Sequence, residues 1–182
     1  MLYYYHMKKA LFIIASNNFR DEEYFVTKEV LEKGGINIKT ASDKCKAIGK
    51  FGGEARADLL INDINIDEFD VVIFPGGRGA VELLDNELTY SIIKKVISKG
   101  KLLAAICIAP TILAKAGVLI GKKATVWSTA LDKSAINILR DNDVKYERKE
   151  IVIDGNIITG ENAEFSQEFG EAILEELTKI KK

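Results

Sequence analysis

The residue best suited to chemistry in this 182-residue chain is Cys107. Ala105 and Ala109 flank it two residues away on either side, between the apolar run 102–106 and a helical pattern starting at Pro110. A nucleophile elbow needs small residues there, because the strained strand-to-helix turn leaves no space for large side chains. The helix start adds free N–H groups and partial positive charge, which favour a thiolate. This pattern predicts a reactive cysteine; the alternative is a small buried core residue.

A glycine turn is the second candidate element. Pro75, Gly76 and Gly77 directly follow the predicted strand 70–74, which is apolar from Val71 onward. Glycines at such a place let backbone N–H groups face a ligand without obstruction by a Cβ atom, as an oxyanion hole requires. We expect the N–H groups of Gly76, Gly77 and Ile108 to form that hole; a plain tight turn is the alternative.

Three consecutive acidic residues, Asp21, Glu22 and Glu23, start the first helical pattern. For Asp21 and Glu22, favourable interaction with the helix macrodipole is a sufficient interpretation. Glu23 has a catalytic role only if it points into the crevice, where burial would raise its pKa and let it donate a hydrogen bond to a thiolate. Cys45 lacks an elbow and is interpreted as structural, and Trp127 as a core or interface residue.

Composition restricts the classes of function. The 26 basic and 27 acidic residues nearly balance, so a nucleic-acid partner is not expected. No apolar run approaches the ~20 residues that a membrane span needs. The two cysteines lie too far apart for a disulfide framework or a metal knuckle. We therefore expect a cytoplasmic protein with no cofactor, no metal site and no membrane partner.

Strand and helix patterns alternate along the chain, which predicts an α/β fold with a mostly parallel sheet and helices on both faces. We expect one domain over 8–182, preceded by an N-terminal extension or cloning leader at 1–7. The stretch 44–65 predicts a small hairpin or an irregular excursion. The predicted strands are 10–15, 36–41, 70–74, 102–106, 124–126, 151–153 and 157–159, and the predicted helices are 21–33, 89–99, 110–116, 132–141 and 163–181. Ligands of such sheets bind beyond the carboxyl ends of the strands.

With these residues in view, the chain resembles the ThiJ/PfpI family, which includes the Parkinson's-linked cysteine deglycase and the archaeal PfpI-type peptidases. The resemblance covers nearly the whole chain and rests on the blocks 18–23, 70–77, 104–110 and 166–173. It implies a flavodoxin-like three-layer sandwich that forms a homodimer or a higher homo-oligomer. It also implies a cysteine of low pKa supported by a carboxylic acid, here Glu23.

Three positions depart from the family pattern. PfpI-type peptidases carry a histidine at the position of Ile108, and a glutamate donated to the neighbouring subunit at the position of Val81, with Glu82 one residue out of step. The deglycase branch has a histidine where this chain has Trp127. Since His6 is the only histidine, no Cys–His dyad can form within the domain, which argues against a peptidase or a glutamine amidotransferase.

Cysteine, a carboxylic acid and an oxyanion hole are sufficient for chemistry on small electrophilic carbonyls. The leading hypothesis is therefore a glyoxalase- or deglycase-like enzyme that uses Cys107 and Glu23. One alternative is a sensor without turnover, in which Cys107 is oxidised. The other alternative is a PfpI-type intracellular cysteine peptidase.

Overall fold

The computed structural model describes residues 7–179. The predicted extension therefore lies, apart from Met7, outside the described residues. Seven strands form the main sheet in the order β11-β12-β8-β7-β1-β3-β6, and every neighbouring pair is parallel except β11 and β12. These strands are β1 (Lys9–Ile13), β3 (Asn37–Ser42), β6 (Leu59–Leu60), β7 (Val71–Phe74), β8 (Leu102–Ile106), β11 (Ile151–Asp154) and β12 (Ile157–Gly160).

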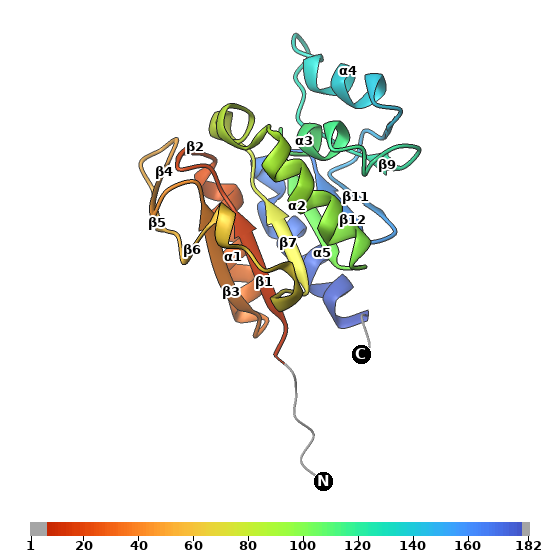
Figure 1. The fold of residues 1–182 in the computed structure, drawn as a ribbon. Coiled ribbons are helices and arrows are strands. Elements are labelled where there is room, and N and C mark those ends of the chain that lie inside the picture. The colour runs from red at the N-terminus through yellow and green to blue at the C-terminus, as the bar shows by residue number, and fades with distance from the viewer. Residues whose placement is uncertain (1–6, 180–182) are drawn as a thin grey trace.

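Helices cover both faces of this sheet, as Figure 1 shows. One face is packed by α1 and α5, which lie against each other, and the opposite face by α2 and α3. The helix α4 packs on α3 at the end of the molecule that also holds the short pair β9 and β10. The bounds are α1 (Asp21–Lys33), α2 (Glu87–Ser98), α3 (Pro110–Lys115), α4 (Ser134–Asp141), α5 (Ser166–Lys179), β9 (Lys123–Ala124) and β10 (Lys145–Tyr146). The mostly parallel α/β sandwich predicted from the sequence is confirmed.

The apolar strand runs fill two separate cores. Because successive side chains of a strand point to opposite faces, each buried strand serves both helical layers. Phe12 and Ile73 face the core formed with α1 and α5, whereas Leu11 and Val72 face the core formed with α2 and α3. A continuous apolar run is therefore required, and it predicted these strands within about two residues. The exception is β6, which lies in the segment 44–65 and was not predicted as a strand of this sheet. Outside the main sheet, β9 is one residue shorter than the predicted strand 124–126.

The segment 44–65 contains the predicted hairpin. Strands β4 (Lys46–Gly49) and β5 (Glu54–Arg56) pair antiparallel, and β2 (Asn17–Phe19) joins them in a small second sheet. The tip of this hairpin is held by Asp21, whose carboxylate accepts hydrogen bonds from the N–H groups of Phe51 at 2.9 Å and Gly53 at 2.7 Å. Asp21 therefore does more than complement the helix macrodipole, which was the sequence interpretation.

Strand register brings the candidate segments to one edge of the sheet. Phe74 pairs with Ala105, and Gly160 pairs with Ile106. The chain leaves β7, β8 and β12 at neighbouring points, so the turn that contains Gly76, the cysteine and the loop after Gly160 must meet. The architecture therefore assembles the site predicted from separate blocks of sequence.

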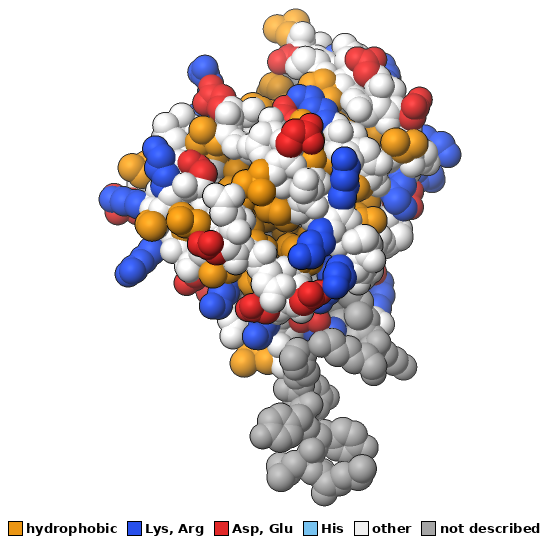
Figure 2. Space-filling model, viewed as in Figure 1, with side chains coloured by type: hydrophobic (Ala, Val, Ile, Leu, Met, Phe, Trp, Pro, Cys, Tyr) orange, Lys and Arg blue, Asp and Glu red, His pale blue; other side chains and the backbone are white. Residues whose placement is uncertain are grey.

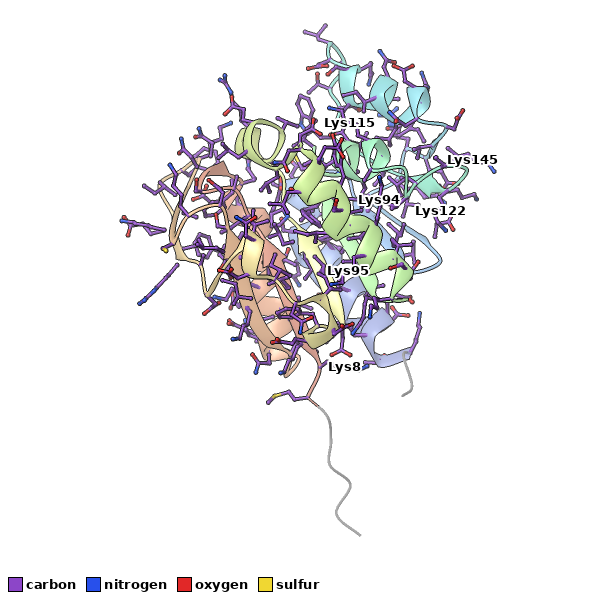
Figure 3. The ribbon with its side chains drawn as sticks, in the orientation of Figure 1. Lys8, Lys94, Lys95, Lys115, Lys122 and Lys145 are labelled. Atoms are coloured by element: carbon purple, nitrogen blue, oxygen red, sulfur yellow. The ribbon has the colours of Figure 1, made fainter. Side chains whose placement is uncertain are left out.

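The surface agrees with the balanced composition. Figure 2 shows acidic and basic side chains intermixed over one face, with hydrophobic atoms exposed between them. Figure 3 labels lysines that belong mainly to α2, to the end of α3 and to the region of β9 and β10. Within residues 7–179, no helix has the length and the apolar character needed to cross a bilayer.

Candidate active site

Cys107 occupies a strained turn between β8 and α3. Its φ angle is +64°, in the left-handed region that residues with a Cβ atom rarely adopt. Two hydrogen bonds hold this conformation: Cys107 N–H donates to the carbonyl oxygen of Gly160 at 3.0 Å, and Trp127 N–H donates to the carbonyl oxygen of Cys107 at 2.9 Å. The backbone of the elbow is thus fixed on both sides. A strained backbone of this kind, together with its adjacent pockets, is typical of a functional site.

Glu23 is fully buried at 0% exposure, although it belongs to the first turn of α1. Its Oε2 accepts a 2.6 Å hydrogen bond from Gly76 N–H. Its Oε1 is buried and has no nitrogen or oxygen partner among the described residues. The Glu23 and Cys107 side chains interact directly. A buried acidic group and a partly buried thiol therefore form one pair.

Burial controls the protonation of this pair. Removal from water raises the pKa of Glu23 to about 8, although Gly76 N–H, the Cys107 side chain and the Arg20 charge act in the opposite direction. Burial also raises the pKa of the Cys107 thiol, and the charge and hydrogen bonding of Glu23 raise it further. The backbone N–H groups of Ile108 and Gly77 lower the thiol pKa, but they do not outweigh burial.

The direction of the thiol pKa contradicts the low value that the family resemblance implied. The physical reason is that the thiol loses much of its surrounding water, although Cys107 as a residue is only partly buried, and that it lies beside an acid that can carry negative charge. When Glu23 is protonated its negative charge is absent, and that contribution to the thiol pKa disappears. The two groups must therefore be treated as a coupled pair that loses its protons in steps.

The glycine turn differs from its expected role at one position. Gly76 N–H is bound to Glu23, so it does not face the crevice. The N–H groups of Gly77 and Ile108 interact with the sulfur and remain as the donors of the predicted oxyanion hole. Gly76 is instead required for space: a Cβ atom there would lie 2.9 Å from the carbonyl oxygen of Ile106 and 3.0 Å from both Cys107 Cβ and Glu23 Oε2.

Two adjoining pockets open beside the sulfur, with volumes of about 320 and 600 Å³. Both are lined by Arg20, Cys107 and Trp127. The smaller one adds Glu23, Ser128, Thr129, Asn162, Ala163 and Glu164. The larger one adds Asn18, Lys50, Gly77, Arg78, Val81 and Ile108. These volumes suit small molecules.

Sequence reasoning missed several of these lining residues. Trp127 was interpreted as a core or interface residue, but it is half-buried and lines both pockets. Arg20, Lys50 and Arg78 were not singled out as site residues, although Arg20 lies within the recognised block 18–23 and Arg78 directly follows the block 70–77. Asn162 follows β12 by two residues, and the rule that ligands bind beyond strand ends was the available signal.

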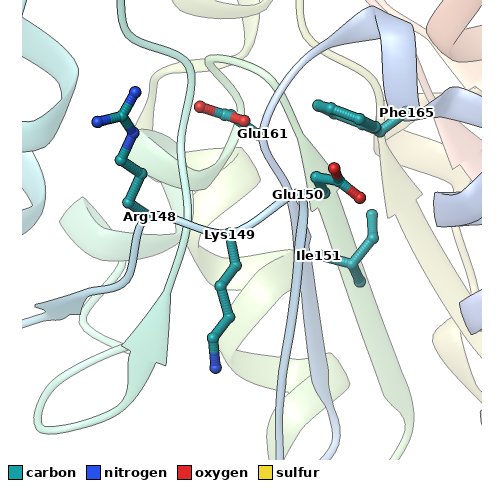
Figure 4. A pocket seen from close by; sticks show the side chains of 6 residues that line it. All are labelled: Arg148, Lys149, Glu150, Ile151, Glu161 and Phe165. Atoms are coloured by element: carbon teal, nitrogen blue, oxygen red, sulfur yellow. The ribbon is translucent and has the colours of Figure 1, made fainter.

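The other pockets described here do not combine a cysteine with a buried acid. A pocket of about 560 Å³ is lined by Arg148, Lys149, Glu150, Ile151, Glu161 and Phe165. Figure 4 shows the Arg148 and Lys149 side chains pointing in opposite directions, and no cysteine lines this pocket. Cys45 is exposed on the hairpin, away from the sulfur of the elbow. Within residues 7–179, no group of three or more His, Cys, Asp or Glu side chains is arranged to hold a metal ion.

The chain belongs to the DJ-1/PfpI family, whose model matches residues 8–176. It is 36% identical over 152 residues to a protein named as a deglycase from Pyrococcus horikoshii, covering 83% of this chain and 88% of that protein. It is 28% identical over 171 residues to a glutathione-independent glyoxalase from Caenorhabditis elegans, covering 93% and 89%.

The fold comparison agrees with the sequence comparison. The crystal structure of a ThiJ/PfpI domain protein from Brachyspira murdochii superposes with a TM-score of 0.91 at 30% identity, covering 96% of this chain and 99% of that one. The crystal structure of DJ-1beta from Drosophila melanogaster gives a TM-score of 0.84 at 32% identity, covering 94% and 90%. The family and the flavodoxin-like fold inferred from the sequence are both confirmed.

Proposed function

We propose that this protein is a cysteine-dependent enzyme acting on small electrophilic carbonyls, of the glyoxalase or deglycase kind. One observation carries the proposal: a buried acid with a pKa near 8 faces a strained cysteine beside a small-molecule pocket. The names of the Pyrococcus and Caenorhabditis relatives support the same class of reaction. All the groups needed for this chemistry belong to the chain itself.

With methylglyoxal as substrate, the sulfur of Cys107 attacks the aldehyde carbon and forms a C–S bond. Glu23 takes the thiol proton and passes it to the carbonyl oxygen, giving a hemithioacetal, while the N–H groups of Gly77 and Ile108 stabilise the developing oxyanion. Glu23 next moves the proton from C1 to C2, and the hydroxyl proton on the C1 oxygen moves to the C2 oxygen; this isomerisation oxidises the aldehyde carbon, reduces the ketone carbon and gives the thioester. Water then hydrolyses the thioester, and the net reaction is methylglyoxal plus water to lactate.

The pH profile of this reaction follows from the protonation of the Cys107–Glu23 pair. The attack needs a pair that holds one proton, because a fully protonated pair has neither a thiolate nor a base. That form appears as the pH rises through about 8, where Glu23 loses its proton. We expect kcat/KM to rise about tenfold per pH unit below this point and to level above it.

The test is lactate formation from methylglyoxal by the wild type and by Cys107→Ser. We expect the variant to lose at least about a hundredfold in kcat/KM, because the hydroxyl is a far weaker nucleophile. Equal rates in the two proteins would refute the proposal. Circular dichroism of both proteins controls for folding.

Oxidation of Cys107 without turnover is the second candidate, and one observation favours it. The buried Oε1 of Glu23 has no nitrogen or oxygen partner, so protonated Glu23 can donate a hydrogen bond to a sulfinate oxygen at Cys107. Two equivalents of hydrogen peroxide would add two oxygens to the sulfur and release two waters. Intact-mass spectrometry after mild peroxide, with peptide mapping, should place both oxygens on Cys107; oxidation at Cys45 alone would contradict this candidate.

The PfpI-type peptidase hypothesis gains no support from the site. Ile108 and Trp127 line the pockets where the family's histidines are expected, and Val81 replaces the family's glutamate, while Glu82 is exposed and paired with Arg78. We keep the predicted homodimer as a proposal, and light scattering in solution measures it.

A further inference from the structure

The larger of the two pockets beside Cys107 has an unusual charge. Arg20, Lys50 and Arg78 line it, and none of its lining residues is acidic. The two acidic residues of the site, Glu23 and Glu164, line the smaller pocket instead. The sulfur therefore lies between a cationic compartment and a polar compartment that contains carboxyl groups.

The positive charge of the larger pocket is only partly neutralised. Arg20 pairs with Glu22, with 2.9 Å between Nε and Oε2, and Arg78 pairs with Glu82. Lys50 forms no ion pair within residues 7–179. A cation without an anionic partner in the lining of a pocket favours an anionic ligand, because low-dielectric walls focus its field.

Two of these cations, Arg20 and Lys50, share one aromatic contact. The ring of Phe51 lies beneath both, with its centroid 4.8 Å from Arg20 Cζ and 5.5 Å from Lys50 Nζ. The backbone of this loop is fixed by the two hydrogen bonds to Asp21 and by Lys50 N–H, which donates to the carbonyl oxygen of Phe19 at 2.8 Å. Preorganised charges lose less entropy on binding than mobile surface lysines do.

We propose that the carbonyl substrate carries an anionic group, a carboxylate or a phosphate, which binds in the compartment of Arg20, Lys50 and Arg78 while the electrophilic carbon meets Cys107. This inference rests on the proposed function and adds a substrate class to it. Trp127 lines both compartments, whereas Glu23 lines only the smaller one, so the anionic end of the substrate lies away from the carboxylate that takes the thiol proton.

The test uses two alkylating reagents that differ in charge but need no turnover. Iodoacetate and iodoacetamide both form a C–S bond with Cys107 and release iodide, but only iodoacetate carries a carboxylate. Their rate constants are measured by intact mass at pH 8.5 and low salt, in a Cys45→Ser background that leaves one reactive thiol. The same two reagents with 2-mercaptoethanol give the reference ratio for a thiol without a binding site.

We expect the iodoacetate-to-iodoacetamide ratio of Cys107 to exceed the reference ratio about tenfold, and to fall as salt screens the pocket. Lys50→Gln should lower the ratio at least threefold. Lys46→Gln is the matched control, because it removes one positive charge from the same hairpin at a residue that does not line the pocket, and it should change the ratio less than twofold.

Three results would overturn the inference: a ratio equal to that of 2-mercaptoethanol, equal effects of the two lysine variants, or a Cys107 that reacts with neither reagent. The outcome is separable from the proposed function. Lactate formation without a preference for iodoacetate would refute the anionic substrate alone. A preference for iodoacetate without lactate formation would refute turnover and leave the anion-binding compartment.

Discussion

The Glu23→Gln substitution tests the buried acid most directly, through the pH dependence of folding stability. In the native protein burial raises the pKa of Glu23 from 4.5 to about 8, whereas in the unfolded chain its carboxyl is solvated and ordinary. Below pH 4.5 both states are protonated, and the stability is fully present. As the pH rises, the unfolded state ionises first, so stability is lost until Glu23 also ionises in the native state near pH 8.

The magnitude follows from the size of this difference in pKa. Each pH unit between the two pKa values changes the free energy of unfolding by about 1.4 kcal/mol. Over the whole interval the wild type should lose on the order of 5 kcal/mol, and between pH 6 and 8 about 2 to 3 kcal/mol. The glutamine variant stays neutral, and its amide oxygen can still accept the hydrogen bond from Gly76, so it should lack this loss.

The assay is urea unfolding of both proteins at several pH values from 5 to 9. We expect the difference in free energy of unfolding to move in favour of Glu23→Gln by about 2 to 3 kcal/mol between pH 6 and pH 8. Glu29→Gln on the exposed side of the same helix is the control, and its curve should parallel that of the wild type. Parallel curves for Glu23→Gln and wild type would refute a buried carboxyl with a raised pKa.

Two further predictions concern the backbone of the site. Gly76→Ala should cost about 1 to 3 kcal/mol and slow thiol labelling at Cys107 at least tenfold, because the added Cβ atom would crowd both members of the pair; wild-type rates with a thiol reagent would contradict this. At Cys107, whose φ is +64°, glycine should give a protein about 1 kcal/mol more stable than alanine does, the reverse of the order expected in regular structure. Urea unfolding of Cys107→Gly and Cys107→Ala measures the difference, and a more stable alanine variant would show that the turn is not strained.

Features that arise from local packing or steric rules could be predicted from the sequence, whereas features that arise from contacts between distant segments could not. The buried strands were predictable because each must supply apolar side chains to two cores, which leaves a continuous apolar run such as 71–74. The elbow was predictable because steric crowding at a tight turn selects small residues next to Cys107. The small sheet that contains the hairpin could not be placed, because its tip is fixed by Asp21, about thirty residues earlier in the chain.

The protonation of the pair was also beyond the sequence. Residue types indicated a thiol and an acid, but the sign of a pKa change depends on how much water remains around each group, and burial turned out to dominate. Gly76 was likewise predicted to be an oxyanion-hole donor, whereas its N–H group is bound to Glu23. Its N–H group and the missing Cβ atom both serve Glu23, a contact 53 residues away along the chain.

The amino-acid sequence by itself determined the α/β architecture, the family and the two residues, Cys107 and Glu23, that we propose as the reacting pair, because these depend on apolar periodicity and on local steric rules at turns. Only the tertiary structure decided which charges line the space around Cys107. Arg20, Lys50 and Arg78 come from three different segments, and the field that they produce depends on distance and dielectric surroundings, which folding alone sets.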